Sequence, residues 1–336
     1  MNHITSQNPY FGTDFFTFIA VLAQRAWGFL TGSSMELTSD EIQMLVLVGI
    51  SISGALVGSF LMLRQMSMLA NSLSHTVLLG IVLVYLYMSR FSHGDHDHSS
   101  SLNVQGFLLA SLGMGVITTF LTEFLTKVGK VQEDASNGLV FTSLFALGII
   151  LATIFARNAH VGTEAIMGNV HMLHREDLKL VYVICLINAA LFLLFYKEYK
   201  ITTFDAPLAS ALGISTTFFN YLLMIQVSAV TVGAFRAVGV LMVLALIIGP
   251  PLAARRLTNS LGWMLCFAAL IGALASIMGV ALSRHFLSVE QVALSTGGLV
   301  VCCIGFLYLL VIFFAPRTGL LFKFYQMKNL KRVSEK

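Results

Sequence analysis

Charged residues are scarce in this sequence. Only 11% of its 336 residues are Asp, Glu, Lys or Arg, whereas 57% are hydrophobic and the mean hydropathy is +0.84. A soluble domain carries about a quarter of its residues as charged groups, because its surface faces water. The composition therefore excludes an ordinary soluble domain, a disordered chain and a collagen-like chain, and it indicates one polytopic membrane unit.

The sequence also lacks two spacing patterns that point to other chemistry. Its four cysteines lie inside apolar runs without Cys-x-x-Cys spacing, which excludes a disulfide scaffold and predicts small core residues. There is no Gly-x-x-x-x-Gly-Lys-Ser/Thr loop, because Gly129-Lys130 is followed by Val131 and has no upstream glycine. We therefore expect no enzymatic activity in this chain, and any coupling to ATP requires a separate ATPase subunit.

Long apolar windows predict an all-α polytopic membrane bundle of about nine transmembrane helices. A spanning helix needs about 20 mostly apolar residues, since each residue rises about 1.5 Å across a hydrocarbon layer about 30 Å thick. The stretch 218–254 is too long for one span, so we divide it at the glycines that flank Arg236. The predicted spans are 43–63, 72–89, 105–126, 139–156, 180–196, the two halves of 218–254, 261–283 and 292–315.

The spans divide the chain into three parts. Residues 1–42 are an extracytoplasmic or interfacial N-terminal segment, in which residues 10–30 form either an interfacial helix or a tenth span. Residues 43–315 are the transmembrane domain, and residues 316–336 are a basic tail. Thirteen of the 20 Lys and Arg residues lie on the same side as this tail, so the positive-inside rule places the C-terminus in the cytoplasm.

His75 is the one histidine inside a predicted span. An ionisable group in lipid is expensive and normally faces a cavity or a protein partner. Asn71 lies four residues earlier, so the two side chains share one helix face and can converge on a ligand. The same spacing is compatible with a structural role, in which His75 makes a hydrogen bond to a carbonyl of another helix.

Three other polar residues in or near the spans have simpler interpretations. Glu123 is close to the cytoplasmic boundary and has Lys127 four residues later, which predicts an ordinary ion pair. Asn188 and Gln226 are expected to make hydrogen bonds between helices, the usual role of buried amides in membrane bundles.

A second group of metal-binding residues lies between two spans. The segment Ser92-His-Gly-Asp-His-Asp-His-Ser-Ser100 brings His93, His96 and His98 together with two carboxylates, a set that suits Zn, Mn or Fe. It is either a low-affinity capture loop for metal or a polar linker.

The cytoplasmic loop 197–217 predicts a short capped helix. Asp205 suits the N-cap, Pro207 the first turn and Gly213 the stop. Such a helix between two spans can dock another subunit, or it can be a well-formed connection and nothing more.

Four motifs resemble those of manganese, zinc and iron ABC transporter permeases, the ABC-3 type. They are Arg64-Gln-Met-Ser-Met-Leu-Ala-Asn-Ser-Leu-Ser-His-Thr-Val-Leu-Leu-Gly80, Phe204-Asp-Ala-Pro-Leu-Ala-Ser-Ala-Leu-Gly-Ile214, Arg236-Ala-Val-Gly239 with Leu246-Ile-Ile-Gly-Pro-Pro-Leu-Ala-Ala-Arg-Arg256, and Phe314-Ala-Pro-Arg-Thr-Gly-Leu-Leu321. Together they cover about residues 43–321 in the expected order, which is far more specific than any one motif.

The resemblance implies a permease subunit of an ATP-binding cassette importer in the bacterial cytoplasmic (inner) membrane. Its cargo is a divalent metal (Mn, Zn or Fe), with no permanently bound cofactor. The implied partners are cytoplasmic ABC ATPase subunits, an extracytoplasmic metal-binding protein, and a second permease copy or a paralogous permease. Membrane lipid surrounds such a subunit, and no nucleic acid is involved.

The resemblance also assigns residues to roles. In the family, the Asp and His of the first motif line the metal path, and they correspond to Asn71 and His75. ATPase coupling corresponds to the second motif, and the path or gate to the third. The residues concerned are Phe204, Asp205, Pro207, Leu212 and Gly213 for coupling, and Arg236, Gly239 and Pro250 for the path or gate.

Asn71 is a departure from the family pattern. An amide in place of the carboxylate removes an anionic ligand, so either the ion is held more weakly or a paralogous permease supplies the carboxylate. The same departure leaves open an ABC permease for a metal chelate, such as a siderophore or haem. An ion-driven secondary transporter is a further alternative, but it is expected to have inverted repeats and several carboxylates within the membrane. A purely structural membrane scaffold is the last alternative, and it leaves His75 and the capped loop 197–217 without a role.

Overall fold

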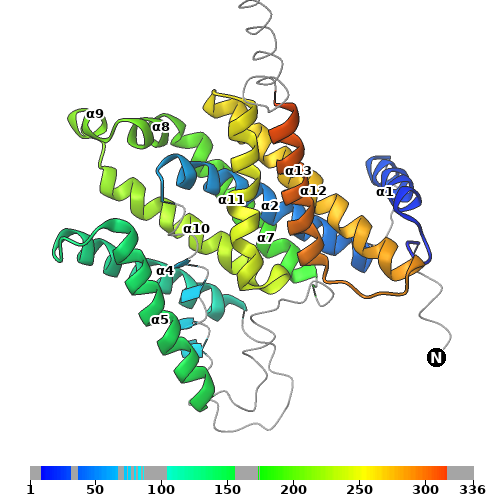
Figure 1. Cartoon of the computed structure of the whole chain (residues 1–336), viewed down its shortest axis with the longest axis horizontal. Helices are drawn as coiled ribbons and strands as arrows, with labels where there is room; N and C mark the ends of the chain where they lie inside the picture. The colour runs from blue at the N-terminus through cyan, green and yellow to red at the C-terminus, as the bar shows by residue number, and fades with distance from the viewer. Residues whose placement is uncertain are drawn as a thin grey trace, which may run out of the picture.

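The computed structural model describes residues 9–31, 37–66, 104–155, 173 and 175–315, with positions 72–73, 75–76, 79–80, 82–84 and 86. Every regular element in this part of the chain is an α-helix, as predicted. The helices are α1 (Phe15–Leu30), α2 (Ser39–Leu63), α4 (Val104–Lys127), α5 (Glu133–Phe155), α7 (Arg175–Leu194), α8 (Tyr196–Phe204), α9 (Ala206–Ala211), α10 (Thr216–Val238), α11 (Val240–Leu257), α12 (Leu261–Val289) and α13 (Thr296–Phe314) (Figure 1). The described positions from 72 to 86 are also helical and are called the His75 segment below.

Eight of the nine predicted spans coincide with described helices. The ninth, 72–89, falls on the His75 segment, so the count of nine stays a prediction. By length and hydropathy, five of the described helices are able to cross a membrane, namely α2, α5, α7, α12 and α13. The division of 218–254 is confirmed, because α10 and α11 are separated by Gly239 alone. Its φ of 79° lies in the left-handed region that favours glycine.

Helix α2 lies in the middle of the bundle (Figure 1). It packs against α7, α10, α11 and α12, and 78% of its most apolar window is buried, against 17% in α5 and 22% in α13. Apolar side chains left exposed on a membrane helix face lipid or another subunit. The core of this chain is therefore built around α2, and α5 and α13 lie at its periphery.

Prolines in α11 explain how closely α2 approaches it. Pro251, which follows Pro250, has no N–H, so the carbonyl of Ile247 four residues earlier has no helical donor. This oxygen is so close to α2 that a β-carbon added at Gly58 would lie 1.8 Å from it. Gly54, one turn earlier in α2, faces the same residue of α11. The Gly-x-x-x-Gly spacing therefore lets the two backbones touch, as small residues do between membrane helices.

The polar residues that we interpreted as simple helix contacts have that role. Asn188 Nδ2 donates to Ser53 Oγ at 2.8 Å, Tyr199 Oη donates to Gln226 Oε1 at 2.6 Å, and Glu123 pairs with Lys127. The first two bonds join α7 to α2 and α8 to α10, and the ion pair lies within α4.

The prediction that the cysteines are core residues is only partly right. Cys303 is buried and Cys185 is half-buried, but Cys266 and Cys302 are exposed, and all four are free thiols. The prediction is wrong for the two exposed residues because an apolar face of a membrane helix can be covered by lipid instead of protein.

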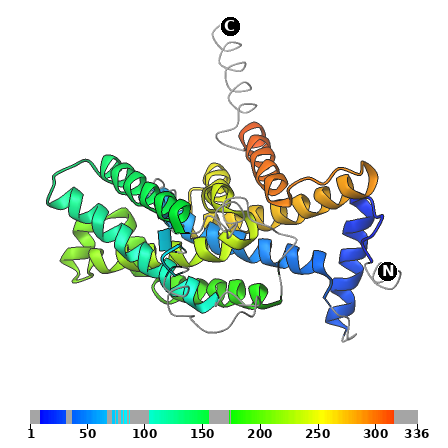
Figure 2. The ribbon, with the colours of Figure 1, turned by 90° about the horizontal axis from the view of Figure 1, so that it is seen from below.

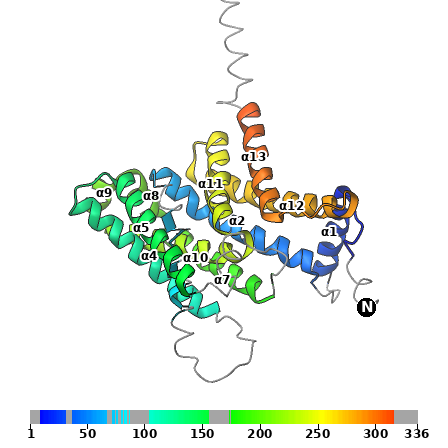
Figure 3. The same ribbon diagram turned by 60° about the horizontal axis from the view of Figure 1, so that its bottom comes forward.

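Helix α1 crosses the ends of α2 and α12 instead of running alongside them (Figure 2). It packs against α12, which continues to Val289, six residues past the predicted end of that span at 283. Helices α8 and α9 lie at the opposite end of α2 (Figure 1). The α4–α5 hairpin also lies away from α1, and its two helices are side by side (Figure 3).

Candidate functional site

His75 lies beside two aromatic rings of α5. Its imidazole centroid is 4.9 Å from the ring of Phe141 and 5.1 Å from that of Phe145, which are one turn apart and so share a helix face. The His75 side chain is half-buried, and its Nδ1 is buried with no hydrogen-bond partner among the described residues. The hydrogen bond to another helix, which the spacing left open, is therefore not made at this nitrogen.

Hydroxyl groups and a glycine hold the His75 segment against α4 and α5. Ser72 Oγ donates to the carbonyl of Asn137 at 3.4 Å, and Thr118 Oγ1 donates to Thr76 Oγ1 at 3.1 Å. At Gly80 an added β-carbon would lie 3.2 Å from a backbone oxygen of α4. The segment therefore packs into the α4–α5 hairpin. Asn137 lies one turn before Phe141 in α5, nearer to the start of that helix.

Three buried oxygen atoms that the sequence did not single out lie near the turn of this hairpin. Thr122 Oγ1, Ser136 Oγ and Asn137 Oδ1 are buried without a hydrogen-bond partner within the described ranges. Buried polar groups normally have partners, so these atoms are suited to a ligand that supplies the missing interactions. Ser136 and Asn137 precede the predicted span 139–156, and nothing in the apolar pattern distinguished them from loop residues.

The remaining candidate metal ligands lie outside the described residues. These are Asn71 and the three histidines His93, His96 and His98. Within the part of the chain that is described, no group of three or more His, Cys, Asp or Glu side chains is placed to hold a metal ion. The pairing of Asn71 with His75 and the capture loop therefore stay predictions.

The candidate path or gate residues lie in α10 and α11. Gly239 is the one-residue connection between these helices. Pro250 is buried on the α12 side of α11, where its Cγ would lie 3.4 Å from a β-carbon added at Gly272. Arg236 is in the last turn of α10, and its side chain is outside the described set. Pro250 is thus part of a helix contact, and its role in a path or gate is untested.

The loop 197–217, which we predict to be cytoplasmic, contains most of two helices, α8 and α9, joined at an elbow. Asp205 ends α8 and caps α9, since its Oδ1 accepts from the Leu208 N–H at 2.9 Å. Pro207 is in the first turn of α9, and Gly213, with a φ of +78°, ends it. The predicted cap, first turn and stop are all confirmed. The structure adds α8, which begins at Tyr196, the last residue of the predicted span 180–196, and continues into the first part of the loop.

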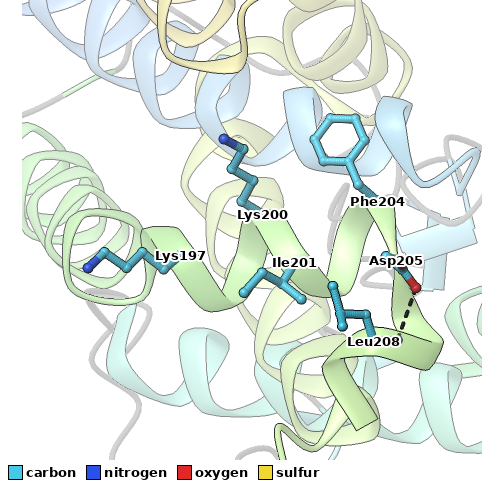
Figure 4. Close-up of a pocket in the computed structure, with 6 residues that line it drawn as sticks. All are labelled: Lys197, Lys200, Ile201, Phe204, Asp205 and Leu208. Atoms are coloured by element: carbon cyan, nitrogen blue, oxygen red, sulfur yellow. Dashed lines mark hydrogen bonds between the residues drawn. The ribbon is translucent and has the colours of Figure 1, made fainter. Parts of the chain in front are cut away.

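A groove of about 430 Å³ runs along the α8–α9 elbow (Figure 4). Lys197 and Lys200 stand on its α8 side, and Leu208 comes from α9. Phe204 and Leu212 add exposed apolar surface, with 62% and 59% of each residue accessible. Large apolar side chains at the tip of this elbow, flanked by basic residues, form a surface suited to another protein.

Arg64 connects this elbow to the membrane helices. It follows the last residue of α2, and its Nε and Nη2 donate to Thr203 Oγ1 at 3.0 Å and Thr202 Oγ1 at 2.8 Å, both in α8. Its Nη1 donates to Asn220 Oδ1 of α10. Burial lowers the pKa of the Arg64 guanidinium below its ordinary value, although arginine remains charged. One side chain thus ties together α2, α8 and α10.

Comparison with known proteins gives relatives along nearly the whole chain. The chain is 37% identical over 331 residues to a probable metal transport system membrane protein of Chlamydia pneumoniae, with 98% of this chain and 97% of that protein covered. It is 35% identical to the manganese transport system membrane protein MntD of Bacillus subtilis, with 85% and 95% covered. It is 38% identical to the zinc transport system membrane protein TroD of Treponema pallidum, with 86% and 77% covered.

A solved structure and a family model agree with these relatives. The structure of PsaBC from Streptococcus pneumoniae in complex with Fab matches with a TM-score of 0.71 and 25% identity, and the match covers 88% of this chain and 97% of that chain. The model of the ABC 3 transport family matches residues 39–315, which include every described helix from α2 to α13. The chain therefore belongs to the ABC 3 transport family of membrane permeases.

Proposed function

We propose that this chain is the permease subunit of an ATP-binding cassette importer that moves Mn²⁺, Zn²⁺ or Fe²⁺ into the cytoplasm. The observation that carries the proposal is the family match over residues 39–315, together with close relatives named for manganese and zinc transport. The C-terminus is cytoplasmic in this proposal, and ATP hydrolysis takes place on separate subunits. An extracytoplasmic binding protein delivers the metal, and a second permease completes the path.

In this proposal His75 offers its imidazole to the ion within the membrane, beside Asn71. Imidazole and neutral oxygen ligands suit all three metals. The buried oxygens of Thr122, Ser136 and Asn137 then solvate the ion as it leaves towards the cytoplasm. Because Asn71 offers an amide oxygen where the family motif has a carboxylate, the site holds the ion weakly, which favours release over storage.

Reconstitution tests the function directly. The permease, its ATPase and its binding protein are placed in vesicles, and uptake of free Mn²⁺ or Zn²⁺ is compared with uptake of the same metal as a siderophore chelate or as haem. ATP-dependent uptake of the free ion is the expected result. Uptake of the chelate alone would replace the proposal with the chelate permease, and metal uptake driven by an ion gradient without ATP would reject both.

We expect the α8–α9 elbow to dock the ATPase, so Asp205→Lys should weaken that association. Lysine removes the acceptor that caps α9, a loss of about 1 kcal/mol in helix stability, and reverses the charge beside the groove. Asp205→Asn is the matched control, because asparagine caps helices as well as aspartate does. Co-purification of ATPase with permease should drop at least about fivefold for Lys and stay level for Asn. Equal recovery with all three proteins would place the docking surface elsewhere.

We expect Arg64→Gln to separate ATP hydrolysis from transport. The shorter neutral side chain leaves hydroxyl and amide acceptors on α8 and α10 without their donor, so movement of the elbow no longer reaches α2. The amount of metal moved per ATP hydrolysed should fall about tenfold, while the complex still assembles. A tenfold change corresponds to a coupling free energy in the range usual for allosteric proteins.

Arg255→Gln is the matched control for this change, since Arg255 is an exposed cytoplasmic arginine at the end of α11. It should keep the wild-type ratio of metal to ATP. If Arg64→Gln kept that ratio as well, Arg64 would be a stabilising residue without a part in coupling.

A further inference from the structure

Helix α1 has an exposed face without charge. Phe16 and Trp27 are 82% and 70% exposed, and Ile19 lies on the same side. The single charged residue of α1, Arg25, points the other way, towards α2, where its side chain is only 17% exposed. A helix that faces water carries charged groups on its outer side. The exposed face of α1 is therefore poorly suited to contact with water.

A polar network fixes α1 to the ends of two membrane helices. Arg25 forms an ion pair with Glu41 at the start of α2, with Nη2 3.2 Å from Oε2, and the Tyr10 hydroxyl donates to Glu41 Oε1 at 2.8 Å. Arg284 of α12 pairs with Asp40 at 2.9 Å, and its Nε donates to the Tyr10 carbonyl at 3.3 Å. Burial and the Glu41 carboxylate raise the pKa of Tyr10, so this phenol remains a donor. The network joins the N-terminal segment, α2 and α12 at one point.

The charged groups of this network indicate that it lies at the boundary of the membrane. Charged groups collect at the ends of spans, and both α2 and α12 are long and apolar enough to be spans. Helix α1 lies across their ends (Figure 2), at the far end of α2 from the cytoplasmic elbow (Figure 1). Its 16 residues reach about 24 Å, less than a hydrocarbon layer of about 30 Å, so its length also argues against a span.

We propose that α1 lies in the outer leaflet of the bilayer, parallel to the surface, with Phe16, Ile19 and Trp27 among the lipid chains just below the headgroups. Aromatic residues favour this depth, where one side of the ring is apolar and the other meets water. The lipid then holds α1 in place. Arg25 of α1, together with Tyr10 just before this helix, in turn holds the outer ends of α2 and α12 together. This inference does not depend on which cargo the permease carries.

The two tryptophans of the chain, Trp27 and Trp263, make a direct test possible. A Trp263→Phe variant leaves Trp27 as the sole tryptophan of this chain, and the full permease complex is placed in nanodiscs whose lipids carry bromine at a shallow or a deep position of the acyl chain. The signal of the same complex with Trp27→Phe and Trp263→Phe together is subtracted, because the partner subunits contribute tryptophans of their own. Bromine quenches tryptophan fluorescence only on contact. We expect the shallow bromine to quench Trp27 at least about twice as strongly as the deep bromine, and aqueous acrylamide to quench it weakly.

Each other pattern of quenching overturns the proposal. Stronger quenching by the deep bromine would make α1 a span. Strong quenching by acrylamide without any by bromine would place the helix in water. Protection from both would mean that a protein, either a second copy or the binding protein, covers the face. The matched control is Trp27→Phe, in which Trp263, 65% exposed on the first turn of α12, must be quenched by brominated lipid if the nanodiscs are correctly formed.

Discussion

Metal uptake by the His75→Ala variant is expected to be more than about 100-fold slower than uptake by the wild type. Loss of a residue that only supports a metal ligand typically lowers metal affinity or activity by about 10- to 100-fold, and loss of the ligand itself should lower it at least as much. Alanine removes the one imidazole in the predicted spans and leaves apolar surface between Phe141 and Phe145. An ion that loses water in this environment then has no nitrogen ligand in exchange. The rate is measured as ATP-dependent uptake of radioactive manganese or zinc into vesicles that contain the complete transporter.

His285→Ala is the matched control for this experiment. His285 is also half-buried, also lies beside a phenylalanine ring, and also has a buried Nδ1 without a partner in the described structure, but it is on α12. It should transport normally. The Asn71→Asp variant adds the carboxylate of the family pattern, and it should lower the metal concentration that gives half-maximal uptake. If His75→Ala transported every metal at the wild-type rate, the proposed ligand role would be wrong.

Replacing Gly58 with leucine is expected to prevent assembly of the bundle. The added β-carbon alone would lie 1.8 Å from the Ile247 carbonyl oxygen, which belongs to the backbone and cannot turn aside. Helix α2 would have to move away from α11, at a cost of about 3 kcal/mol or more. Because α2 is the central helix, its displacement disturbs contacts with α7, α10 and α12 as well.

The Gly58 variant is examined by size-exclusion chromatography and by thermal unfolding in detergent. Gly305→Leu in α13 is the matched control, since a β-carbon at Gly305 meets no atom within 4 Å. It should elute as a single peak, with a stability equal to wild type or higher by less than about 1 kcal/mol. A Gly58→Leu protein that elutes and melts like wild type would show that α2 and α11 are not in backbone contact.

The sequence predicted those parts of the fold that depend on local chemistry. Apolar windows identified the spans, the glycines that flank Arg236 indicated the division between α10 and α11, and Asp205 and Gly213 marked the two ends of α9. Helix α8 was missed because its mixture of Lys, Glu and Tyr resembles a loop when only long apolar runs are counted. Pro250 and Pro251 gave no indication that a freed carbonyl would meet Gly58, because that contact joins segments almost 200 residues apart.

The same division applies to the candidate site. His75 was found because one ionisable group in an apolar window is conspicuous. Its neighbours Phe141 and Phe145 are apolar residues of an apolar helix, and only the packing of α5 against the His75 segment gives them a role. Arg64 was visible as the first residue of a motif, but its contacts with α8 and α10 depend on three helices meeting.

The contact between Gly58 and the freed carbonyl of Ile247 has a mechanical consequence. Two helices whose backbones touch have no intervening side chains that could change rotamer to let one helix slide along the other. We therefore expect α2 and α11 to move together as one rigid body. The His75 segment is held by hydroxyl groups, which can exchange one partner for another at little cost. When the transporter alternates its access, we therefore expect the His75 segment to shift against the α4–α5 hairpin, while α2 and α11 stay together as one frame.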